Sequence, residues 1–227
     1  MSRPSGPFRA LVLDVDSTVS GIEGIDWLAA RRGDVVARRI KDLTRQAMQG
    51  ALPLEAVYGT RLAEIRPRRE EVDALSRAYV GAIAPGAPEA IARMHHAGVQ
   101  VVLVSGGVRA ALFRLAFHLG LGPSDVHAVS VRFDSLGAYV GYDASSPLTT
   151  AAGKARVVAA LGLEGPVIAA GDGATDLAMR DVVDAFVAFT GFVARPGVVE
   201  NADAVVSSFA ELERVVLSES SLTQRSA

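Results

Sequence analysis

The sequence predicts an α/β protein, a doubly wound parallel sheet of the Rossmann type that carries a small all-helical insert. Three observations lead to this class. Short apolar runs recur along the chain, segments with a helical pattern separate them, and one long charged block near the beginning contains no strand-like run. An alternation of strands and helices is typical of a parallel sheet covered by helices.

Five apolar runs are the candidate strands. Three are continuous and end in small or acidic residues, and they cover residues 9–15, 99–105 and 166–172. Two shorter runs, residues 184–189 and 202–208, are interpreted as later strands of the same sheet. Parallel strands that are buried on both faces have such sequences, because neither face meets water.

Helical patterns fill the gaps between these runs. One covers residues 88–98, with Pro88 near its start and Gly98 at its end. Another covers residues 108–120 and ends in a glycine in the same way. Proline is tolerated in the first turn of a helix and glycine commonly follows the last, so both segments are predicted to be helices that cross from one strand to the next.

Two segments break the alternation. Residues 20–83 contain charged helical patterns and no convincing strand, which predicts a helical insert directly after the first strand. Residues 1–19 and 84–227 would then form the α/β core. Residues 126–143 alternate apolar and polar side chains around a Ser-Leu-Gly turn, and this pattern predicts a β-hairpin.

Composition excludes several classes of protein. The 227 residues are 50% hydrophobic, which is enough for a packed core, and the formal net charge of −2 offers no basic field for a nucleic acid. There are no cysteines, so disulfides, thiolate catalysis and cysteine-type zinc sites are excluded. With no leader-like start and no apolar run near the roughly 20 residues of a membrane span, we expect a cytoplasmic protein without membrane or nucleic-acid partners.

Polar residues that can take part in catalysis or ligand binding follow three of the predicted strands. Asp14 and Asp16 end the first, Ser105-Gly106-Gly107 follow the second, and the third leads into a Gly-Asp-Gly-Ala-Thr-Asp segment at residues 171–176. In an open α/β sheet, ligands bind beyond the carboxyl ends of the strands, so these sets should meet in one crevice. Lys154, at a predicted helix start, supplies a basic residue.

This combination indicates a phosphoryl group bound together with Mg²⁺. Clustered carboxylates without histidine or cysteine favour a hard cation with oxygen ligands, and Asp14 and Asp172 are candidates to hold it. A Ser-Gly-Gly turn before a helix offers backbone N–H groups to a phosphate. One carboxylate can then attack phosphorus while a second acts as general acid and base. Asp14 and Asp16 point to the same side of a strand, which lets both flank one phosphorus atom.

Each of these signals has a plainer interpretation when taken alone. A strand end followed by a helix cap explains the first motif, an ordinary turn explains the glycine-rich ones, and a solvated side chain explains Lys154. The order of the four motifs along the chain is what favours a catalytic site, because four independent weak signals seldom occur in this order by chance.

The segments "LDVDST", "VSGG", "GK" and "GDGATD" resemble the four motifs of the haloacid dehalogenase superfamily of phosphotransferases. Together with "DVDSTVSGIEGIDWLA" and the cap-like segment from Leu43 to Val72, they make residues 8–216 similar to the phosphoserine phosphatase family of that superfamily. The resemblance implies a helical cap at residues 20–83, and a magnesium-dependent hydrolysis of O-phospho-L-serine to L-serine and phosphate in serine biosynthesis. It also implies an aspartyl-phosphate intermediate.

The resemblance also assigns roles to residues. Asp14 is expected to be the nucleophile and Asp16 the acid and base, while Asp14, the carbonyl of Asp16 and Asp172 bind the metal. The residues expected to hold the phosphoryl group are Ser105, Gly106, Gly107 and Lys154, with Thr175 and Asp176 in support. In the cap, Glu23 matches the residue for the substrate ammonium, Arg61 the one for its carboxylate, and Met48 and Gly50 lie around the substrate.

Two positions depart from the family pattern, and two other functions stay open. Leu54 stands where the family often has phenylalanine, and Gln49 where the animal type has glycine, which affects how tightly the pocket closes. One alternative is the same chemistry on another small ester such as phosphothreonine, or transfer to an acceptor such as homoserine. The other is a non-enzymatic binding module, against which the presence of Asp14, Asp16 and Lys154 argues. The protein is expected to be a monomer or a homodimer.

Overall fold

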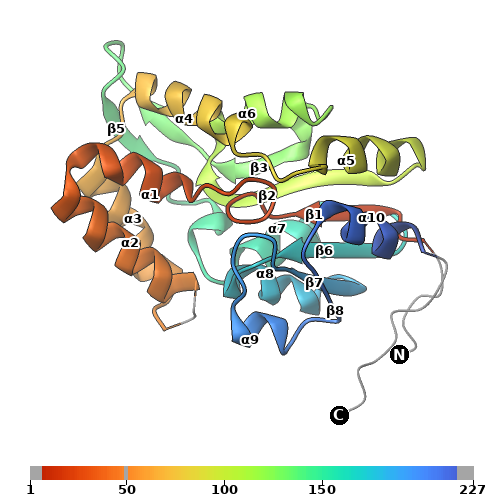
Figure 1. Ribbon diagram of the computed structural model, residues 1–227. Coiled ribbons are helices and arrows are strands. Elements are labelled where there is room, and N and C mark those ends of the chain that lie inside the picture. Colours follow the sequence, from red (N-terminus) through yellow and green to blue (C-terminus); the bar gives the residue numbers. More distant parts are fainter. Residues whose placement is uncertain (1–6, 49–50, 219–227) are drawn as a thin grey trace.

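The fold is a six-stranded parallel sheet with helices packed around it, which confirms the predicted class (Figure 1). The computed structural model describes residues 7–48 and 51–218. The strands run in the order β3-β2-β1-β6-β7-β8, and every neighbouring pair is parallel. Their bounds are β1 Ala10–Leu13, β2 Gln100–Val108, β3 Val126–Val129, β6 Val167–Gly171, β7 Ala185–Phe189 and β8 Ala204–Val206.

The strand order places β1 at the centre of the sheet. From β1 the chain continues to β2 and β3 on one side, whereas β6, β7 and β8 follow on the other. All four residues of β1 are buried, as are all five of β6 and of β7. Their continuous apolar sequences follow from this position, because helices cover both faces of the sheet. The reversal of strand order between β1 and β6 is where such folds bind their ligands.

The crossover helices begin and end near the predicted positions. Helix α5 is Ala87–His96, with Pro88 in its first turn, and α6 is Arg109–His118. In Figure 1, α5 and α6 lie on one side of the sheet and α7 and α8 on the other. The remaining helices of this part are α7 Gly153–Ala160, α8 Ala174–Leu177, α9 Pro196–Val199 and α10 Phe209–Leu217.

Four helices lie between β1 and α5. They are α1 Gly24–Ala29, α2 Asp34–Met48, α3 Leu54–Ile65 and α4 Arg69–Gly81. Three of them were predicted as charged helical segments, while α1 was not. In the described part of residues 20–83 the only extended pairing is at isolated bridges, and one of these joins Ser20 to Ile83. The chain therefore leaves and re-enters the sheet region through two segments that lie side by side, and α4 packs along α6.

The predicted hairpin at residues 126–143 is partly wrong. Only β4 (Val131–Phe133) and β5 (Tyr139–Tyr142) form an antiparallel pair, whereas Val126–Val129 is β3, an edge strand of the main sheet. The alternating pattern was read correctly as extended chain, but it does not say which strand will be the hydrogen-bonding partner. In the described ranges, no helix is both long and apolar enough to cross a membrane.

Candidate active site

Residues from five separate segments line one pocket at the carboxyl ends of β1, β2 and β6. Every predicted residue whose side chain is described, except Asp176, borders this pocket. The members of this set are Asp14, Asp16, Glu23, Arg61, Ser105, Gly106, Gly107, Lys154, Asp172 and Thr175. The structure therefore brings the ends of these strands together at one pocket, as predicted. The side chain of Met48, and residues Gln49 and Gly50, lie outside the described part of the chain.

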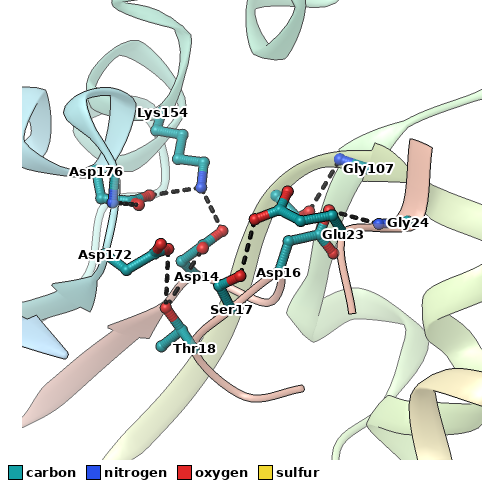
Figure 2. Close-up of polar contacts among 12 residues, drawn as sticks. Asp14, Asp16, Ser17, Thr18, Glu23, Gly24, Gly107, Lys154, Asp172 and Asp176 are labelled. Carbon is teal, nitrogen blue, oxygen red and sulfur yellow. Dashed lines mark hydrogen bonds and ion pairs between the residues drawn. The ribbon is translucent and has the colours of Figure 1, made fainter. Parts of the chain in front are cut away.

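Lys154 connects two carboxylates of the pocket. Its ammonium pairs with the Asp14 carboxylate and donates to Asp176 Oδ1 at 2.5 Å (Figure 2). Burial alone would lower the pKa of Lys154, but the charges of Asp14 and Asp176 raise it, so the lysine stays charged. Burial and the charge of Asp176 raise the pKa of Asp14 to about 7, and Lys154 opposes that shift. Lys154 therefore offers a permanent positive charge beside Asp14.

The position of Lys154 depends on its neighbour in the chain. Gly153 starts α7, and a Cβ atom built on it would lie 1.9 Å from the carbonyl oxygen of Pro147. A backbone oxygen cannot swing aside as a side chain can, so only glycine lets α7 approach this closely. The close contact between α7 and Pro147 thus explains the "GK" pair. Gly153 permits this contact, and the contact fixes the position of Lys154.

We expect Gly153→Ala to lower both stability and activity. The added methyl group forces α7 away from Pro147, at a cost of about 1–3 kcal/mol for an overpacked site, and displaces Lys154 from Asp14. The matched control is Gly197→Ala, because a Cβ built there meets nothing within 4 Å. Urea unfolding and phosphate release measure the two effects. Equal behaviour of the two variants would show that the close approach is unimportant.

Three buried carboxylates could hold a metal ion. One oxygen each from Asp14, Asp172 and Asp176 lies within 4.8 Å of the others, and Thr18 Oγ1 lies between Asp14 Oδ2 and Asp172 Oδ1, at 3.4 and 3.5 Å (Figure 2). Asp176 also accepts from the Gly173 N–H at 2.8 Å. With its two oxygens bonded to Lys154 and Gly173, Asp176 is the least available of the three. The donor set contains only oxygen, which fits a hard divalent cation.

Arg195 was not foreseen from the sequence. It lies in the loop between β7 and α9, and its guanidinium pairs with the Asp172 carboxylate and donates to the Asp172 carbonyl oxygen at 3.2 Å. The same guanidinium lies 3.8 Å from Glu23 Oε1. Arg195 stands in no phosphate-binding motif, and only the tertiary structure brings it to Asp172 and Glu23.

Asp16 is oriented by two donors. The hydroxyl of Tyr79 donates to Oδ1 at 2.6 Å and the backbone N–H of Gly24 donates to Oδ2 at 3.1 Å. Burial, together with the charges of Glu23 and Asp14, raises the pKa of Asp16 well above its usual range. A carboxyl that can exist protonated beside an ionisable neighbour has the property that a general acid requires.

The Ser-Gly-Gly segment lies within β2 and does not form the separate turn that was predicted. The pairing of β2 with β3 shifts register between Val104 and Val108, and α6 starts only at Arg109. Ser105 Oγ accepts from the Gly107 N–H at 2.9 Å, which curls the segment around the serine side chain. The expectation of a glycine-rich segment just before a helix holds, with the segment continuing the strand.

The side of the pocket formed by the helical segment carries charges of opposite sign. Glu23 Oε1 accepts from Ser17 Oγ at 2.8 Å, and burial raises the pKa of Glu23 (Figure 2). Arg61 is only 2% exposed, and its Nη1 donates to Thr44 Oγ1 at 3.0 Å. Its Nε is buried without a hydrogen-bond partner. A buried donor without an acceptor costs free energy, so this nitrogen is suited to an anionic ligand that enters the pocket.

Two further residues of α3 line the pocket: Leu54, which was expected to affect how tightly the pocket closes, and Tyr58, which was not predicted. Tyr58 donates from its hydroxyl to the Gly106 carbonyl at 2.8 Å and thus joins the helical segment to the Ser-Gly-Gly segment. Leu54 packs in the same wall. Leu54, Tyr58 and Arg61 recur at the i, i+4 and i+7 positions of one helix face, and this spacing is a signal that could have found Tyr58.

The fold and the pocket together define a hydrolase of a known superfamily. The family model "haloacid dehalogenase-like hydrolase" matches residues 11–181, which include β1, the helical segment and the strand ends that carry the acids. This class accounts for the parallel sheet, for the helical segment after its first strand and for paired aspartates at the end of that strand.

Within that superfamily, the chain belongs to the phosphoserine phosphatase family. The phosphoserine phosphatase of Bos taurus is 38% identical over 206 residues, which are 89% of this chain and 91% of that protein. A structure solved as a substrate-bound phosphoserine phosphatase complex has a TM-score of 0.78 and 25% identity, covering 92% of this chain and 98% of that one. A phospho-aspartyl intermediate analogue of phosphoserine phosphatase has a TM-score of 0.77 and 26% identity, covering 92% and 99%.

Proposed function

We propose that this protein hydrolyses O-phospho-L-serine to L-serine and inorganic phosphate, through a phosphorylated Asp14 and with Mg²⁺ bound. The assignment of the substrate rests on the pair of opposite charges on the helical side of the pocket. Glu23 suits an ammonium group, and Arg61, with its unpartnered buried Nε, suits a carboxylate. An ester without an amino-acid head group would bring no acceptor to the buried Nε of Arg61 and no ammonium to Glu23.

The phosphate end of the pocket supports the reaction itself. At this end Asp14, Asp16, Asp172 and Lys154 line the pocket, while Asp176 pairs with Lys154 and Arg195 pairs with Asp172 behind them. The excess of negative charge and the oxygen donors favour a bound divalent cation, and Asp14 and Asp172, with the Asp16 carbonyl, would hold it. When bound, Mg²⁺ neutralises charge on the phosphoryl oxygens and so allows an anionic nucleophile to approach.

The steps follow from the positions of the two aspartates. The Asp14 carboxylate attacks phosphorus, the bond from phosphorus to the serine oxygen breaks, and Asp16 gives its proton to that oxygen. Water then attacks the phosphorus of phospho-Asp14, Asp16 takes the proton of the water, and phosphate leaves with Asp14 restored. Ser105, the N–H groups of Gly106 and Gly107, and Lys154 bind the phosphoryl oxygens throughout, while Thr175 borders the same end of the pocket.

We also infer that residues 20–83 act as a cap. Glu23, Arg61 and Tyr58 reach the pocket from this segment, so their placement depends on where it lies relative to the sheet. The two connecting segments meet at the Ser20–Ile83 bridge, where the Gly21 N–H donates to the Ala82 carbonyl at 2.9 Å. A movement about these segments would admit substrate, and closure would exclude bulk water during transfer.

The first experiment is phosphate release from a panel of esters with Mg²⁺ and with EDTA. The panel contains L-phosphoserine, D-phosphoserine, phosphothreonine, phosphoethanolamine and glycerol phosphate. We expect a strong preference for L-phosphoserine, loss of release with EDTA, and recovery when Mg²⁺ is returned in excess. Preference for another ester would refute the substrate but keep the chemistry, and release that is indifferent to EDTA would refute the metal. Homoserine added to the reaction tests transfer, because a phosphorylated product would then appear.

A further inference from the structure

Asp16 is bonded on both of its carboxylate oxygens by groups of the helical segment. The Tyr79 hydroxyl reaches Oδ1 at 2.6 Å and the Gly24 N–H reaches Oδ2 at 3.1 Å (Figure 2 shows the latter bond). Each carboxylate oxygen can accept two hydrogen bonds, so a second lone pair on each stays available for a proton in transit. The two bonds therefore restrict the orientation of the carboxyl without blocking proton transfer.

Tyr79 is held at both of its ends. Its side chain is completely buried near the end of α4, and its carbonyl oxygen accepts from Ser20 Oγ at 3.1 Å, directly at the paired connecting segments. The ring therefore spans from the connection between helical segment and sheet to the acid of the pocket. The hydroxyl of a buried tyrosine needs a hydrogen-bond partner, and the partner of Tyr79 is the Asp16 carboxyl.

Gly24 and Tyr79 fit one another closely. A Cβ atom built on Gly24 would lie 2.0 Å from the Tyr79 hydroxyl oxygen and 3.0 Å from the ring carbon that bears it. A Cβ built on Gly107, in the Ser-Gly-Gly segment, would lie 3.5 Å from the same oxygen. The hydroxyl is thus enclosed between backbone at Gly24 and Gly107 and the Asp16 carboxyl, and the absence of a side chain at residue 24 makes room for it.

We propose that Tyr79 is a positioning residue for the reaction, which holds the Asp16 carboxyl by its hydroxyl so that Asp16 can give and take the proton at the correct place. This inference rests on the proposed function. Whenever Asp16 is ionised, the charges of Glu23 and Asp14 repel it, so without a donor its side chain would turn away from them. Tyr79 and the Gly24 N–H oppose that rotation, and both belong to the segment that would move as a cap.

A double-mutant cycle tests the proposal. Tyr79→Phe removes only the hydroxyl, and we expect kcat to fall roughly 10- to 100-fold, part of the 10²–10⁴ that general acid–base catalysis contributes, with KM within about twofold. In the Asp16→Asn background, the same change should have almost no further effect, because Tyr79 acts through Asp16. Equal losses in both backgrounds would overturn the proposal, as would unchanged kcat in the single variant.

Two controls separate positioning from general damage. Tyr139→Phe removes the hydroxyl of another buried tyrosine, outside the pocket, and should leave kcat unchanged. Gly24→Ala introduces the Cβ that collides with the Tyr79 hydroxyl and should reproduce the loss of kcat. If Gly24→Ala retains full activity, the hydroxyl is not needed where it lies.

The cycle is run on whichever ester of the panel releases phosphate fastest, so that an incorrect substrate assignment does not affect it. A crystal structure of Tyr79→Phe gives a readout that needs no turnover. We expect the Asp16 carboxyl to have rotated away from its position between residues 24 and 79. An unrotated carboxyl in that variant would overturn the positioning role, even if the protein released no phosphate from any ester.

Discussion

Asp14→Asn is expected to abolish turnover while the protein stays folded. An amide cannot attack phosphorus as a carboxylate can, so phosphate release should fall by about 10⁴-fold or more, as when the nucleophile of another covalent mechanism is removed. Asparagine has the shape of aspartate and fits the same buried place, where Asp14 is 4% exposed. The loss of the Asp14 charge relieves repulsion from Asp172 and Asp176 but removes one ion pair of Lys154, which keeps Asp176 as its partner.

The measurement is phosphate release under single-turnover conditions, together with a urea titration. We expect the unfolding midpoint of Asp14→Asn to stay close to that of the parent protein, because these two effects oppose one another. Mass spectrometry after acid quenching should find a phosphorylated protein in the parent and none in the variant. Turnover within tenfold of the parent would refute Asp14 as the nucleophile, because no other carboxylate could replace it without a large loss.

Arg61→Ala is expected to separate substrates by their head groups. Removal of a guanidinium that binds a buried carboxylate costs about 2–5 kcal/mol, which corresponds to roughly 30- to several thousand-fold in kcat/KM. The loss should appear with L-phosphoserine and be within about fivefold with phosphoethanolamine, which has the ammonium group but no carboxylate. The structural reason for this difference is the unpartnered Nε of Arg61, because of the two esters only L-phosphoserine has a carboxylate that can accept its hydrogen bond.

Arg61→Lys and Arg39→Ala complete this experiment. Lysine keeps the charge but not the two-pronged geometry, so it should recover only part of the loss. Arg39 lies on the exposed surface of α2, where it pairs with Glu64 at 3.6 Å. Its removal should leave kcat/KM unchanged for both substrates. Equal losses on phosphoserine and phosphoethanolamine would show that Arg61 supports the fold through Thr44 and does not bind the carboxylate.

Much of the fold could be predicted because buried strands and helix ends have simple sequence patterns. The central strands β1, β6 and β7 are apolar throughout, and Pro88 and Gly98 bracket α5 as helix signals do elsewhere. The hairpin is the instructive exception. Val126–Val129 has the pattern of a strand, but its partner is β2, far away in sequence, so no local signal could reveal the pairing.

The pocket likewise contains groups that the sequence predicted and is contacted by groups that it did not predict. Sequence by itself determined the acids at the end of β1, the Ser-Gly-Gly segment, the lysine after Gly153 and the Gly-Asp-Gly-x-x-Asp segment, because the topology of a parallel sheet requires strand ends to meet at one edge. Each of those groups stands at a position that a local element fixes, and the order of the elements along the chain is itself informative.

The tertiary structure alone shows which side chains from outside the motifs contact the acids of the pocket. Arg195 reaches Asp172 from the loop after β7, and Tyr79 reaches Asp16 from the end of α4. Neither residue has a periodicity or a motif that distinguishes it from a surface arginine or a core tyrosine. Their roles depend on where one atom at the end of a long side chain lies relative to a distant carboxylate, and that distance is set by the packing of whole elements, which no local pattern in the sequence encodes.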